Sequence, residues 1–311
     1  MKRAFATLLA CTLVAATAFA HEDDDDDRDD DRDRNYGERS IDRRLAADAN
    51  GEVEVSNVAG SVSIEGWNYN EVHVTGNLDS GVKELVFESS GKRTIVKVVT
   101  RKGYHRGGGD ADLRIRVPKN SRLHANTVSA DLTAKGVTGP LDLQSVSGSV
   151  SGDFSGGETE AKSVSGDITL RGDGKPGRLI LTTVSGTAQV TRAAGEVNAS
   201  TVSGELQLQM SKVTRARMNT TSGDLNFNAS LMPGVKIEAE TISGQLTFDL
   251  KDTDAEIDIE SFSGDIDSCT GPEAKRTQKY GPGTELQFTA GKGTGRIELQ
   301  SLSGEINICT R

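Results

Sequence analysis

A short serine-glycine motif recurs at nearly constant spacing from about residue 121 to the C-terminus. Neighbouring motif serines are 18 to 21 residues apart, except the last pair, which are 40 apart. The motif residues are Ser129, Ser147 with Gly148, Ser165 with Gly166, Ser185 with Gly186, Ser203 with Gly204, Ser222 with Gly223, Ser243 with Gly244, Ser263 with Gly264, and Ser303 with Gly304. Self-similarity at this period is typical of a solenoid, whose repeats stack on their neighbours. A barrel or propeller of unrelated hairpins would not repeat equivalent residues at matching positions.

Apolar residues form columns around each motif serine. They occupy the positions one before, three after and five after the serine, and pairs of them lie four and six before it. Around Ser185 these residues are Val184, Ala188, Val190, Leu181 and Leu179. Period-two alternation predicts two half-buried strands per repeat, joined by a bend where glycine can take a positive φ. We therefore expect an all-β parallel solenoid (β-helix) of about nine to ten two-strand rungs over residues 121–311, with these columns facing inward.

A hydroxyl side chain stands two residues before every motif serine. These residues are Thr127, Ser145, Ser163, Thr183, Thr201, Thr220, Thr241, Ser261 and Ser301. Regular threonine tracks on small solenoids can bind ice, but this track mixes serine with threonine and charged columns flank it. We expect the hydroxyls to bond to neighbouring backbone at the bend, where they act as structural groups.

The N-terminus carries an export signal. Lys2 and Arg3 precede an apolar run over 4–17, and Ala18-Phe19-Ala20 has the small residues of a cleavage site. We expect cleavage after Ala20, no later transmembrane segment, and a periplasmic or secreted protein. Residues 21–48 begin with a run of Asp and Arg, so we expect a disordered acidic leader, more a spacer than a cation-binding segment. Short alternating strands over 49–120 are expected to form a β region that caps the first rung.

An insertion at 270–283 interrupts the repeat. It carries Lys275, Arg276 and Tyr280, which makes it the candidate recognition loop; a tolerated insertion is the alternative. Cys269 and Cys309 are the cysteines that remain after the expected cleavage, and export predicts a disulfide between them. If the half-rung at 283–288 lies between them, they are two rungs apart, which is too far for a bond.

The remaining chemistry gives little support for an enzyme. A net charge of −10 excludes a sequence-independent nucleic-acid binder. The histidines, at 21, 73, 105 and 124, lack metal-ligand spacing, so we expect neither metal nor cofactor. Glu205 and Asp224 lie in adjacent rungs at a separation that suits a retaining glycosidase, yet any stacked acidic column has that spacing. We predict no catalytic residues; a polysaccharide lyase or hydrolase is an alternative.

The segments SVSGDITL, TVSGELQL, TISGQLTF and SLSGEINI, preceded by LRIRVPKN, resemble a bacterial family of exported β-strand-repeat domains. The family is labelled "putative adhesin" and has no known function. The likeness covers about residues 49–311 and implies a β-solenoid at the cell envelope with no catalytic residues to carry over. We therefore expect a non-enzymatic binding module for a glycan or an envelope or surface protein. The alternative is a structural protein that forms homo-oligomers by stacking its terminal rungs end to end.

Overall fold

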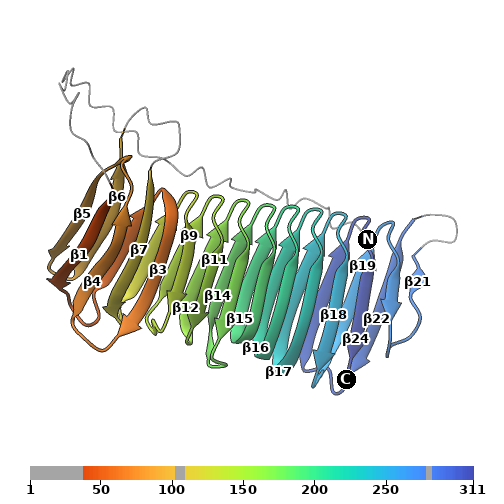
Figure 1. Ribbon diagram of the computed structural model, residues 1–311. Helices are drawn as coiled ribbons and strands as arrows, with labels where there is room; N and C mark the ends of the chain where they lie inside the picture. Colours follow the sequence, from red (N-terminus) through yellow and green to blue (C-terminus); the bar gives the residue numbers. More distant parts are fainter. Residues whose placement is uncertain (1–37, 102–108, 278–281) are drawn as a thin grey trace. The chain divides into compact units, whose positions relative to one another are not determined.

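Each repeat contributes one strand to each of two facing parallel sheets, and the Ser-Gly bend joins the two strands (Figure 1). The computed structural model describes residues 38–101, 109–277 and 282–311. These residues form strands and turns, and they contain no helix long and apolar enough to cross a bilayer. The expected signal peptide over 1–20 and residues 21–37 of the expected leader lie outside the described residues. The all-β solenoid predicted from the repeat is the observed architecture.

The first sheet receives the strand that precedes each bend. Its spatial order is β5 (Val82–Ser90), β6 (Arg93–Thr100), β2 (Glu52–Asn57), β8 (Arg122–Thr127), β10 (Leu141–Ser145), β12 (Gly157–Ser163), β14 (Pro176–Thr183), the second halves of β15 (Ala188–Thr201), β16 (Leu206–Thr220) and β17 (Leu225–Thr241), then β23 (Gly295–Ser301), β19 (Ala255–Ser261), β22 (Thr284–Ala290) and β21 (Lys275–Arg276).

The second sheet receives the strand that follows each bend. Its spatial order is β1 (Arg39–Ala46), β4 (Glu71–Leu78), β7 (Asp110–Pro118), β3 (Ala59–Trp67), β9 (Asp131–Lys135), β11 (Val150–Phe154), β13 (Ile168–Gly172), the first halves of β15, β16 and β17, then β18 (Leu246–Lys251), β24 (Ile306–Thr310) and β20 (Ile266–Ser268).

The order of the rungs in space departs from the order in sequence at both ends. The rung of β6 and β7 lies outside the earlier rung of β2 and β3. The last rung, β23 and β24, lies between β17 and β18 on one side and β19 and β20 on the other. Antiparallel strands then cover the ends: β5, β4 and β1 at one end, and β22 with β21 at the other.

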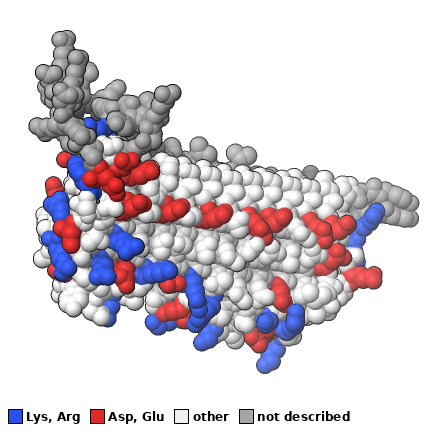
Figure 2. Space-filling model, viewed as in Figure 1, with Lys and Arg blue, Asp and Glu red and all other residues white. Residues whose placement is uncertain are grey.

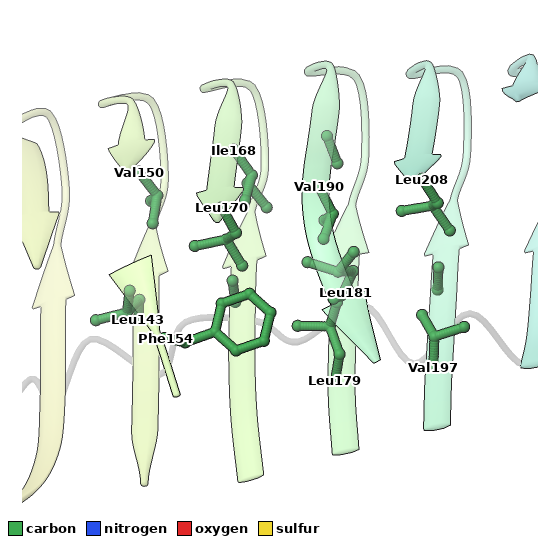
Figure 3. Packing of buried hydrophobic residues seen from close by; sticks show 14 of the residues in the cluster. Leu143, Val150, Phe154, Ile168, Leu170, Leu179, Leu181, Val190, Val197 and Leu208 are labelled. Carbon is green, nitrogen blue, oxygen red and sulfur yellow. The ribbon is translucent and has the colours of Figure 1, made fainter. Parts of the chain in front are cut away.

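The space between the sheets is filled by columns of like side chains (Figure 3). Ile168 pairs with Val150 on one side and Ala188 on the other, and all three are fully buried. Phe227 meets Phe248 of the next rung edge to face, with the ring centroids 5.7 Å apart. Each buried Val, Leu or Ile stabilises the fold by roughly 1.5–3 kcal/mol, so stacking many narrow rungs compensates for the shortage of aromatic residues.

The expectation of disorder across 21–48 is wrong for its last part. Residues 39–46 form β1, which pairs antiparallel with β4 from Arg39 opposite Leu78 to Ala46 opposite Glu71. Ile41 and Leu45 alternate with polar residues and pack against the core, and this apolar contact holds the strand. The Asp-rich run before it dominated the composition of the segment and hid this pattern.

Candidate functional site

The hydroxyl column at the bend is buried, and most of its members bond to the backbone, as the sequence predicts; the Oγ atoms of Ser145 and Ser163 are buried without a partner among the described residues. Thr220 Oγ1 accepts a hydrogen bond from the Gly223 N–H at 2.9 Å and donates one to the Gly223 carbonyl at 2.8 Å. Thr201 accepts in the same way from Gly204, and Ser301 from Gly304. All nine hydroxyl residues are buried, so the track offers no surface to ice or to another ligand.

The bend glycines are required for a reason other than the one expected from sequence. All the bend glycines lie in the described residues, and none of them has a positive φ. They are Gly148, Gly166, Gly186, Gly204, Gly223, Gly244, Gly264 and Gly304. Instead, each backbone touches the one below: a Cβ on Gly223 would lie 1.9 Å from the Gly204 carbonyl oxygen. On Gly244 it would lie 1.8 Å from the Gly223 oxygen. Close stacking of the rungs therefore selects glycine here.

The apolar column directly before the motif serines faces outward, and the expectation that it faces inward is wrong. Val128, Val164 and Ile242 are 43–45% exposed, although the columns three and five after the serine are buried. The bend causes this difference, because it turns two consecutive residues, the apolar one and the serine, toward solvent. The exposed apolar residues stack from rung to rung along one edge of the solenoid.

We call this edge the turn ridge. In spatial order its residues are Val58, Val128, Val146, Val164, Val184, Val202, Thr221, Ile242, Leu302 and Phe262. Six of them are 38–53% exposed. At about 4.8 Å per rung, the turn ridge is roughly 40 Å long.

Each motif serine fixes the turn ridge to the rung beside it. The Ser147 backbone N–H donates to the Val128 carbonyl at 2.8 Å, and its Oγ donates to the same oxygen at 3.3 Å. The same Oγ bond joins Ser203 to Val184 and Ser303 to Ile242. Because the hydroxyl hydrogens point into the backbone, the apolar side chains are the main groups that the ridge offers to a partner.

A row of carboxylates follows the turn ridge on the outer face of the second sheet. Figure 2 shows it as a line of red side chains below an uncharged band. The row consists of Asp131, Asp167, Glu205, Asp224, Glu305 and Asp265. Asp131 accepts hydrogen bonds from the Ser149 hydroxyl and N–H, which lower the pKa of its carboxyl. We call these residues the acidic row.

The acids considered for glycoside chemistry belong to this row and act there as hydrogen-bond acceptors. Glu205 accepts from the side-chain amides of Gln207 and Asn226, and Asp224 accepts from the Gln245 backbone N–H. Neither residue lines any of the three hollows described on the surface, at 40–114, at 63–116 and at 256–296. Both carboxylates are therefore engaged as hydrogen-bond acceptors within the acidic row.

The candidate recognition loop lies at the C-terminal end. Lys275 and Arg276 form β21, are exposed, and pair with Glu285 and Thr284 of β22. Tyr280 lies outside the described residues. The two basic residues therefore belong to the antiparallel strands at the C-terminal edge of the first sheet.

The disulfide is present. Cys269 and Cys309 are bonded, with their Cα atoms 5.1 Å apart. The half-rung that might have separated them is β22, which lies on the outer side of β19 and so does not intervene.

Comparison with known proteins identifies the family. Residues 50–251 match the family described as Toastrack DUF4097. The chain belongs to this family. The match includes most of the turn ridge, from Val58 to Ile242, and ends before the interchanged C-terminal rungs. A search of curated protein sequences finds no match.

Solved structures of similar overall extent have low sequence identity to this DUF4097 chain. A "putative lipid binding protein" from Parabacteroides distasonis ATCC 8503 is 16% identical, with a TM-score of 0.48, and the match covers 88% of this chain and 97% of that one. A "putative adhesin" from Parabacteroides merdae ATCC 43184 is 11% identical with a TM-score of 0.49 and the same coverage. A "putative adhesin" from Bacteroides fragilis NCTC 9343 is 11% identical, with a TM-score of 0.40, covering 87% and 97%.

The C-terminal rungs, beyond the DUF4097 match, concentrate acids around Glu260. Burial, followed by the charges of Asp258, Glu285 and Glu298, raises the pKa of its carboxyl. A carboxyl whose pKa is higher in the folded than in the unfolded protein stabilises the fold at pH values below its unfolded pKa. This stabilisation is lost as the pH rises through the folded pKa. Because Glu260 is exposed, solvent screens these charges, and we expect Glu260→Gln to raise Tm at pH 7 by no more than about 1 °C, with no gain near pH 3.5. Thermal melts at both pH values test this, with Glu158→Gln, an exposed residue without an ion pair among the described residues, as control.

Proposed function

We propose that this DUF4097 protein is a non-enzymatic binding module of the cell envelope that holds an envelope or surface protein along its turn ridge. The carrying observation is the column of ten outward side chains, nine of them apolar and six of them exposed, that repeats in register from rung to rung. Contiguous exposed apolar surface on a soluble domain marks interaction sites. The rigid rungs hold these side chains at a fixed spacing, so a long partner meets a preformed surface.

The chemistry of the turn ridge favours a protein over a glycan as its partner. Sugars are recognised mainly through hydrogen bonds, yet the motif serines donate theirs to the neighbouring rung. The acidic row beside the ridge favours a partner with Lys or Arg next to its apolar residues. Export after removal of residues 1–20 remains part of the proposal; the disulfide between Cys269 and Cys309 supports an oxidising compartment.

Retention on envelope fractions tests the proposal. Immobilised His21–Arg311 is expected to capture an envelope protein saturably, and higher salt is expected to weaken the capture because the acidic row contributes. The double variant Val164→Ser with Ile242→Ser removes two exposed anchors and should lower affinity by about 10-fold. Met232→Ser is the matched control, because Met232 is 40% exposed but lies off the ridge.

Two results would count against the turn ridge as the protein-binding surface. Equal retention by the double variant and the wild type, with unchanged melting curves, would remove the ridge from the contact. Retention that survives protease digestion of the envelope fraction would assign the ligand to glycan or lipid.

A further inference from the structure

The outer face of the second sheet is hollowed at its N-terminal end, away from the turn ridge. Strands β1, β3, β4 and β7 line a groove of about 750 Å³, and a smaller hollow of about 300 Å³ continues from it. The two hollows share Ser63, Thr75 and Arg114, so they form one surface feature. We call it the N-terminal groove. Its size falls within the range of small-molecule sites.

The walls of the N-terminal groove are rich in short polar side chains. Those that can donate and accept hydrogen bonds are Ser40, Ser61, Ser63, Thr75 and Asn77. They come from β1, β4 and β3, and β7 lies between β4 and β3. The lining also includes the apolar residues Ile41, Leu113 and Ile115, but apolar side chains contribute little to it. A polyhydroxylated ligand fits this lining better than an apolar one.

Arg114 is the charged group of the groove that is free to bind a ligand. The other charged groups have partners: His73 Nε2 lies 2.8 Å from Asp42, Arg116 lies 3.2 Å from Glu65, and Asp112 accepts a hydrogen bond from the Ser61 hydroxyl at 2.6 Å. The Arg114 side chain is exposed, lines both hollows, and makes no hydrogen bond or ion pair within the described part of the chain. A guanidinium with free N–H groups binds a carboxylate through two parallel hydrogen bonds.

An aromatic cluster contacts the smaller hollow through His73. The Trp67 ring stacks on the ring of His73, which lines the smaller hollow, with centroids 6.0 Å apart. Tyr69 packs edge to face against Trp67 at 5.0 Å and is 66% exposed. Arg116, which also lines the smaller hollow, lies over the Trp67 ring with its Cζ 5.7 Å from the ring centroid. The indole therefore touches two lining residues, His73 and Arg116, and its fluorescence should respond when a ligand occupies the hollow.

From these features we infer that the N-terminal groove binds a sugar that carries a carboxylate. The carboxylate pairs with Arg114, and the ring hydroxyls bond to the serine, threonine and asparagine side chains. Asp42 and Asp112 accept hydrogen bonds from hydroxyls, so they tolerate a hydroxylated ligand with one negative charge but not a polyanion. This site is separate from the turn ridge and does not depend on the function proposed for it.

Trp67 supplies the measurement, because it is the only tryptophan in the chain. Its fluorescence is titrated with galacturonate, which carries one negative charge, with the methyl ester of galacturonate, and with trigalacturonate, which is a polyanion. We expect a saturable change with the acid and binding at least about 10-fold weaker for the ester, which lacks the charge. Trigalacturonate is expected to bind no more tightly than the monomer, because Asp42 and Asp112 repel its further carboxylates; tighter binding of the trimer would contradict this account of the groove.

The matched arginine variants locate the site. Arg114→Gln should raise the Kd for galacturonate by about 10-fold, whereas Arg171→Gln should leave it unchanged. Arg171 lies on β13 of the same sheet, is exposed, and has no ion pair among the described residues.

Three results would overturn the inference: no titration of the wild type, equal affinity for acid and ester, or equal losses in the two arginine variants. The ester comparison uses only wild-type protein, so it holds even if Arg114→Gln lowers stability. None of these results bears on capture by the turn ridge.

Discussion

Gly223→Ala is expected to destabilise the solenoid by about 3 kcal/mol or more, as judged by guanidinium unfolding. The added Cβ would lie 1.9 Å from the Gly204 carbonyl oxygen and 3.1 Å from the Thr201 Cγ2. Backbone atoms form the obstacle, so no side-chain rotation relieves the clash. Separating the two rungs would break the bond from the Ser222 N–H to the Val202 carbonyl. Each bend glycine contacts the next in this way, and a local shift is therefore passed along the stack.

Gly109→Ala is the control for this prediction. Among the described residues its added Cβ would meet only the Thr100 Cγ2, at 3.4 Å, and its φ is not in the left-handed region. We expect a change within about 0.5 kcal/mol. If Gly223→Ala unfolds at the same guanidinium concentration as the wild type, close stacking does not select glycine at the bend.

Periodicity predicted the interior but not the turn ridge. Counting in twos back from Leu208 and Leu206 through Gly204 places Val202 inside. Counting forward from the first sheet through Thr201 places it outside. Each count is valid on its own strand. In this rung the inward residues have odd numbers before the bend and even numbers after it. The alternation does not show which two consecutive residues both face solvent at the bend. The column directly before the serine is therefore predicted to face inward, although it faces outward.

Strand order at the ends also lies beyond what the sequence predicts. Rungs are expected to stack in sequence order, but the connection through the loop after Cys269 lets β23 and β24 enter between earlier strands. The N-terminal groove depends on a similar rearrangement, since it needs β1 and β4 beside β7. No local pattern brings Asp42, Thr75 and Arg114 together; only the order of the strands does.

The double substitution Cys269→Ser with Cys309→Ser is expected to lower the free energy of unfolding of the C-terminal end by about 4 kcal/mol. The bond closes a sequence separation of 40 residues, and the chain-entropy model gives roughly that value for such a loop. The effect should remain local, because each repeat in a solenoid contacts only its neighbours. β20 is the most dependent strand: it has three residues and pairs with β24 alone among the described strands.

Hydrogen exchange read strand by strand distinguishes a local clasp from a general stabiliser. In the double variant, and in reduced wild-type protein, amides of β19, β20 and β24 should exchange faster, while those of β2 and β3 keep their wild-type rates. The N-terminal strands thus serve as the internal control. Faster exchange throughout would mean that the last rung, held between β18 and β20, transmits its loss along the whole stack. Unchanged exchange in β20 would mean that backbone pairing to β24 is enough to hold this strand. Ser268 and Ile308 are paired in register, and the disulfide would then add little to the stability of that pairing.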